Sequence, residues 1–113
     1  MIEKLEAIKQ RYDVLTEKIA DPAVIAKMDE WKKIAKERAD MEETVNKYIE
    51  YRKVEGDKLA AEQSLLTETD ADMKDLLEEE IFECKKQLEV MIEELKILQI
   101  QFYIVISLMI LYF

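Results

Sequence analysis

Apolar residues recur at alternating intervals of four and three positions in several segments of this chain. The clearest run lies in residues 77–98 and consists of Leu77, Ile81, Cys84, Leu88, Met91, Leu95 and Leu98. This spacing keeps one apolar face, called here the seam, on a single side of a helix for about six turns, with the period of a coiled coil. A lone helix cannot bury such a face, so the pattern predicts partner helices elsewhere in the chain.

The first segment of the chain repeats the pattern. Its apolar positions are Met1, Leu5, Ile8, Tyr12, Leu15 and Ile19. They predict a helix over residues 2–20 that ends at Asp21-Pro22, because proline disfavours helical geometry in the residue before it. We expect residues 23–25 to form a short helical turn whose apolar side chains fill a corner of the bundle.

A second, much longer helix is predicted to begin near Asp29, which suits the N-cap position, and to continue to the polar cluster at residues 67–70. Its expected inner face carries Trp31, Ile34, Met41, Val45 and Tyr48. The apolar period weakens between Arg52 and Lys58, where Gly56 interrupts it at a local cost of about 1 kcal/mol. This predicts a softer, more exposed middle, or a bend.

Residues 67–72 are predicted to form a polar hairpin corner, with Asp70 or Thr69 capping the third helix. The third helix then returns antiparallel to the second, and the first packs beside the pair. With one glycine and one proline in 113 residues, the chain has too few turn formers for a sheet. The expected fold is all-α: an elongated antiparallel helical hairpin plus a shorter N-terminal helix, forming a three-helix, coiled-coil-like bundle.

The net charge of −9 is concentrated in one part of the chain. Residues 68–96 hold eleven acidic residues against four lysines, which disfavours contact with nucleic acid there. The nearly neutral middle carries Lys32, Lys33, Lys36, Arg38, Lys47, Arg52, Lys53 and Lys58. Those residues are compatible with weak RNA contact, although a solvated helical surface of mixed charge is the interpretation that the pattern favours.

The residue types that carry most enzyme chemistry are scarce. There is no histidine, which removes the commonest general base and metal ligand. The single cysteine, Cys84, lies on the seam and is expected to be a small buried residue. Gly56 is the only glycine, so no phosphate-binding loop is present.

Two further clusters favour packing or solvation over chemistry. Glu78, Glu79 and Glu80 point about 100° apart on a helix and do not converge on one ion. Trp31, Tyr48 and Tyr51 have helical spacing and are expected to pack in the core instead of stacking on bases. We therefore predict no catalytic, cofactor-binding or metal-binding residue, and an interaction or structural module, not an enzyme.

Several segments, read in order, resemble the opening of bacterial class-I peptide-chain release factors, and the UAA- and UAG-reading type fits best. The resemblance rests on residues 1–8, Arg11-Tyr12, residues 20–25, residues 31–37, residues 48–52, residues 70–73 and residues 92–98. It implies a non-catalytic N-terminal helical domain, acting in the cytoplasm near the ribosomal stalk base and associated with the GTPase that recycles the factor. The family's Gly-Gly-Gln and codon-reading motifs do not occur here, so no catalytic residue can be carried over.

The resemblance ends at about Leu98, which predicts two parts: a helical domain over 1–98 and an apolar tail over 99–113 that is foreign to the family. Residues 97–113 include no charged side chain. Three interpretations of the tail remain open: a frameshifted or truncated end, a membrane anchor, or an apolar extension that docks on a partner or a second copy. The alternative to a release-factor domain is a tail-anchored or self-associating coiled-coil protein, and the seam itself could also pair between chains.

Overall fold

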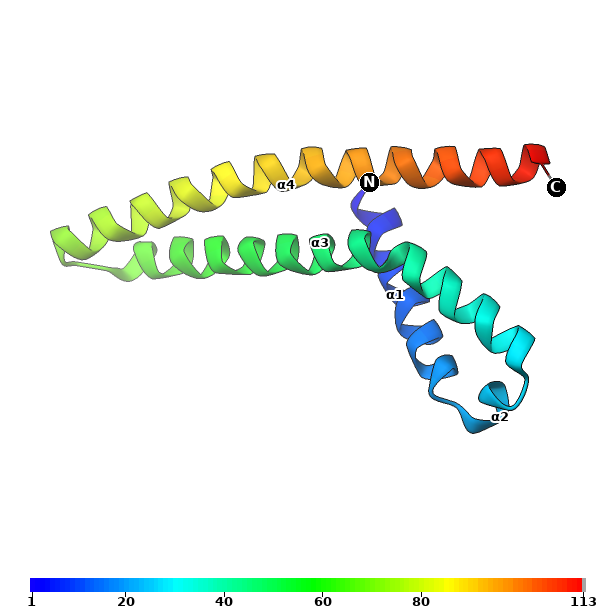
Figure 1. Cartoon of the computed structure of the whole chain (residues 1–113). Helices are drawn as coiled ribbons and strands as arrows, with labels where there is room; N and C mark the ends of the chain where they lie inside the picture. Colours follow the sequence, from blue (N-terminus) through cyan, green and yellow to red (C-terminus); the bar gives the residue numbers. More distant parts are fainter. Residues whose placement is uncertain (113) are drawn as a thin grey trace. The chain divides into compact units, whose positions relative to one another are not determined.

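Helices make up most of the part of the chain that the structure describes, and short connections at residues 20–21, 26–27 and 68–70 join them. The computed structural model describes residues 1–112, and the side chains of these residues except 105, 109 and 112. The helices are α1 (Ile2–Ile19), α2 (Pro22–Ile25), α3 (Met28–Thr67) and α4 (Ala71–Tyr112) (Figure 1). They are distributed over two units, Met1–Tyr48 and Ile49–Phe113, and α3 belongs to both. The all-α prediction is confirmed.

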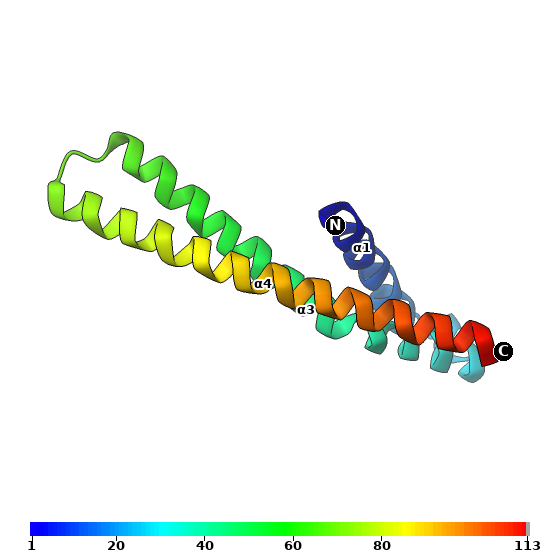
Figure 2. The ribbon, with the colours of Figure 1, turned by 90° about the horizontal axis from the view of Figure 1, so that it is seen from above.

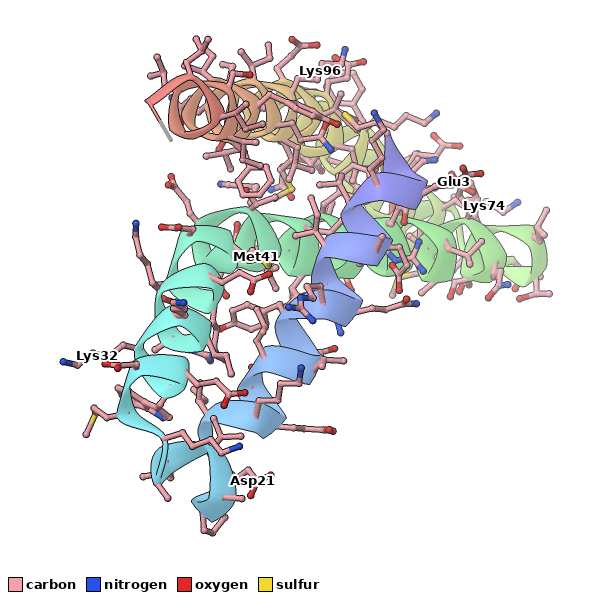
Figure 3. All side chains as sticks on the ribbon, turned by 90° about the vertical axis from the view of Figure 1, so that its right-hand side faces the viewer. Glu3, Asp21, Lys32, Met41, Lys74 and Lys96 are labelled. Atoms are coloured by element: carbon pink, nitrogen blue, oxygen red, sulfur yellow. The ribbon has the colours of Figure 1, made fainter. Side chains whose placement is uncertain are left out.

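In the first unit, α1 packs against the first part of α3. Leu15, Met41 and Val45 are buried together at the centre of this contact, and Met41 lies on the side of α3 that faces α1 (Figure 3). The partly buried residues around this core are Ile8, Tyr12 and Ile34. The alternating pattern therefore identified the inner faces of both segments correctly except at Met1, which is 39% exposed.

A short connection joins α1 to α3. Asp21 caps α2, since its Oδ1 accepts a hydrogen bond from the Ala23 backbone N–H at 2.9 Å, and Pro22 takes the first helical position. Within α2, Val24 is half-buried but Ile25 is 48% exposed. Ala23 is also exposed, so the prediction that this turn fills the corner with its apolar side chains is wrong for Ala23 and Ile25. One helical turn cannot direct neighbouring side chains inward together, because they point about 100° apart.

The start of α3 also differs from the prediction. The helix begins at Met28, and the Lys27 carbonyl accepts the Trp31 backbone N–H at 2.9 Å. Asp29 therefore lies in the first turn and is not the N-cap, so that prediction is wrong. Its carboxylate still lies near the positive end of the helix dipole. Aspartate is favoured both there and at the N-cap, so the sequence does not distinguish the two positions.

In the second unit, the later part of α3 and the first part of α4 run antiparallel, side by side in both views (Figures 1 and 2). Tyr51 and Ala61 are buried on α3, and Ile81 and Cys84 are buried on α4. The remaining seam residues of α4 are buried at Leu95 and half-buried elsewhere: Leu77, Leu88, Met91 and Leu98. The whole predicted seam is therefore turned away from solvent.

The corner of the hairpin is closed by two carboxylates. Oδ2 of Asp70 accepts a hydrogen bond from the Met73 backbone N–H at 3.2 Å, which caps α4. Oε1 of Glu68 accepts from the backbone N–H groups of Thr69 (3.1 Å) and Asp70 (3.0 Å). Of the two predicted caps, the structure uses Asp70 and not Thr69.

Both long helices continue through the positions, Gly56 and Leu98, at which the sequence predicted a change in structure. α3 continues without a break through Gly56, and α4 continues past Leu98 to Tyr112. The tail predicted for residues 99–113 is thus helical as far as the structure describes it, and Phe113 lies outside the described residues. This geometry matches a helical extension.

The open surroundings of Gly56 lead to a stability prediction. A Cβ atom added there would meet nothing within 4 Å, so we expect Gly56→Ala to raise the free energy of unfolding by about 0.5–1 kcal/mol. Ala60→Gly, one turn later at an exposed position of the same helix, should lower it by a similar amount. Urea unfolding followed by circular dichroism measures both. A loss of stability in Gly56→Ala would contradict an unobstructed glycine.

Candidate interaction surface

The side chain with the greatest nucleophilic potential, Cys84, is buried on the seam of α4. Burial raises the pKa of its thiol above the usual value, and the nearby carboxylates of Glu80 and Asp57 raise it further. A catalytic cysteine requires the opposite, an exposed thiol with a lowered pKa. Cys84 therefore serves packing.

The acidic run of α4 remains a solvated surface. Glu78, Glu79 and Glu80 are all exposed. Within residues 1–112, no three acidic, cysteine or histidine side chains gather closely enough to hold a metal ion.

The aromatic residues considered for base stacking are parts of the packing. Tyr48 is 1% exposed and Tyr51 is buried, and burial raises the pKa of the Tyr51 phenol. Trp31 is half-buried and donates its indole Nε1–H to the backbone carbonyl of Ile19 at 3.0 Å. These side chains stabilise the first unit and the hairpin, and they offer no open platform for a ligand.

Two arginines join α1 to α3 across the first unit. The guanidinium of Arg11 donates to both carboxylate oxygens of Glu37, at 3.1 and 3.2 Å. Arg38 lies over the ring of Tyr12, 4.5 Å from its centroid, and donates to Thr16 Oγ1 at 2.9 Å. These contacts fix which turn of α1 faces which turn of α3. Sequence reasoning missed them, because contacts between residues more than 20 positions apart leave no local pattern.

The eight basic residues singled out in the sequence differ in their surroundings, and Lys47 is half-buried. Arg38, Arg52 and Lys58 make intramolecular contacts, the last two with Glu55 at 3.0 Å and Glu62 at 3.2 Å. Lys32, Lys33, Lys36 and Lys53 are exposed. Lys32 projects away from α1 (Figure 3).

A shallow open hollow of about 360 Å³ lies on α3 around Gly56. It is lined by Arg52, Glu55, Gly56, Lys58, Leu59 and Glu62. Its two cations and two carboxylates pair with one another, which leaves little charge for selecting a ligand.

The last part of α4 exposes a concentration of apolar side chains. The exposed ones are Ile97, Ile100, Tyr103, Ile104, Ile106, Leu108, Ile110 and Leu111. Among the helices of residues 1–112, none has a stretch long and apolar enough to cross a membrane. The exposed faces of these helices are the candidate surfaces for contact with other molecules.

Comparison with known proteins finds a matching domain family and similar release factors. The PCRF domain family matches residues 8–101. The chain is 42% identical over 98 residues to peptide chain release factor 1 of Clostridium acetobutylicum, and 41% identical over 98 residues to that of Clostridium beijerinckii. These alignments cover 87% of this chain and 27% of each relative. No solved structure matches the chain.

The family match covers most of the chain, so the protein belongs to the PCRF domain family. The chain spans about a quarter of the length of the curated release factors that it matches. The resemblance to release factors noted from the sequence is confirmed.

The surroundings of Cys84 predict slow chemical modification. A buried thiol with a raised pKa stays protonated to a higher pH than the ordinary value of about 8.5. We expect iodoacetamide to modify Cys84 much more slowly in the folded chain than in guanidinium chloride. We also expect the rate in the folded chain to begin rising at a higher pH. Mass spectrometry of timed samples measures both; equal rates in the folded and unfolded chain would show that the seam is open.

Proposed function

We propose that residues 1–98 are the N-terminal helical domain of a peptide-chain release factor and act in translation termination. The observation that carries this proposal is the PCRF domain match over residues 8–101, together with 41–42% identity to release factors over 98 residues. The predicted boundary at Leu98 belongs to the same proposal, with residues 99–113 as a part foreign to the family.

The proposed partner is the ribosome, near the base of its stalk, and the proposed location is the cytoplasm. The names of the relatives support ribosomal action. Association with a recycling GTPase follows from the family resemblance and is part of the proposal.

The proposed role is binding without catalysis. The sequence contains no Gly-Gly-Gln segment. In the described part of the chain, the one thiol is buried and no histidine exists to activate a hydroxyl. The domain would thus position a factor whose peptide-releasing and codon-reading groups lie outside residues 1–98.

A chimera tests this proposal. Residues 1–98 would replace the matching region of the Clostridium acetobutylicum release factor, and stop-codon-dependent peptide release would be measured on programmed ribosomes. We expect the chimera to release peptide and the present chain alone to release none above background. An inactive but folded chimera would contradict the proposal, as would release by the chain alone.

A matched variant controls for folding of the chimera. Leu15 is fully buried at the contact between α1 and α3, so Leu15→Ala should cost about 2–5 kcal/mol of stability. Val14→Ala, at the neighbouring exposed position, should cost far less. We expect only the Leu15 variant of the chimera to lose release activity on warming.

A further inference from the structure

The end of α4 carries a second apolar stripe on the face opposite the seam. The stripe consists of Ile97, Ile100, Ile104, Leu108 and Leu111, which are 55%, 58%, 53%, 48% and 80% exposed. Ile97 follows the buried seam residue Leu95 by two positions, which turns it about 200° around the helix. The stripe is therefore a separate apolar face and not an edge of the seam.

The spacing of the stripe is symmetric. Its intervals of three, four, four and three positions read the same in both directions from Ile104. Two copies of an antiparallel helix related by a two-fold axis at Ile104 would place Ile97 against Leu111 and Ile100 against Leu108. Ile104 would meet its own counterpart. A self-complementary surface of this kind is what a two-fold homodimer requires.

Charge favours the same arrangement. Residues 97–113 include no charged side chain, whereas Glu89, Glu93 and Glu94 lie just before the stripe together with Lys96, which pairs with Glu93 at 3.1 Å and leaves an excess of acidic groups. Parallel pairing would bring these acidic residues of the two copies together, at a cost in repulsion. Antiparallel pairing places them at opposite ends of the paired segment.

From this symmetry, exposure and charge, we propose that α4 pairs with α4 of a second copy through the stripe, antiparallel about Ile104. Five aliphatic side chains from each copy supply about 1,000 Å² of total buried area, at the small end of specific interfaces. The dimer is therefore reversible, and its population depends on chain concentration.

Sedimentation of the full chain over a range of concentrations tests the pairing. Ile104→Glu places two carboxylates face to face on the axis and should weaken dimerisation by about tenfold or more. Ile110→Glu is the matched control, since Ile110 is 73% exposed on α4 but lies off the stripe. It should change the dissociation constant by no more than about twofold. A wild-type chain that stays monomeric, or equal weakening by both variants, would overturn the proposal.

Cysteine cross-linking tests the antiparallel geometry. In a Cys84→Ala background, Ile104→Cys should form a disulfide-linked dimer on mild oxidation. Ile97→Cys and Leu111→Cys should each remain monomeric alone but form the mixed disulfide when combined. Cross-linking of Ile97→Cys with itself would show parallel pairing and refute the proposed arrangement. Phosphatidylcholine vesicles added before oxidation should leave the yield of the Ile104→Cys dimer unchanged; a chain that binds the vesicles and no longer forms the disulfide would assign the stripe to a membrane surface instead.

Discussion

The structure depends on the burial of one apolar face along α4. An apolar face that repeats every 3.5 residues is unfavourable when it is exposed to water. An isolated helix gains little stability from its backbone hydrogen bonds alone. The later part of α3 supplies Tyr51 and Ala61 as buried residues of the same hairpin, while Ile81 and Cys84 are buried on α4. The corner made by Glu68 and Asp70 reverses the chain so that this burial becomes possible.

The first unit is organised differently, around a small core with polar contacts at its margin. Leu15, Met41 and Val45 supply the burial, whereas Arg11 and Arg38 supply directional contacts between α1 and α3. Arg11 and Glu37 are each more than two-fifths exposed, and exposed ion pairs contribute little to stability because solvent screens them. Their main effect is to select the register of α1 on α3, since a shift by one turn would separate the paired groups.

Features governed by local chemistry were predictable from the sequence, and features governed by distant contacts were not. The seam, the Asp70 cap and the proline boundary follow from spacing and from backbone preferences within a few residues. The sequence predicts Asp29 as the N-cap of α3, yet the helix already begins at Met28, because an aspartate suits the first turn almost as well as the cap. The contacts of Arg11 and Arg38 depend on how two helices meet. The stripe at Ile97 to Leu111 was hidden because most of the residues between its members are also apolar, so the exposed fractions are needed to recognise its face.

Because α4 is one continuous helix, the number of residues in it sets the direction in which its last part faces. Each residue inserted into or removed from this helix rotates everything beyond it by about 100° and shifts it by about 1.5 Å. A single deletion between Leu95 and Ile104 would bring the stripe round toward the side of the seam, whereas a change of seven residues would nearly preserve its direction. Insertions or deletions of seven residues in this helix should therefore be tolerated better than those of other lengths. Point substitutions on its solvated side are far less constrained.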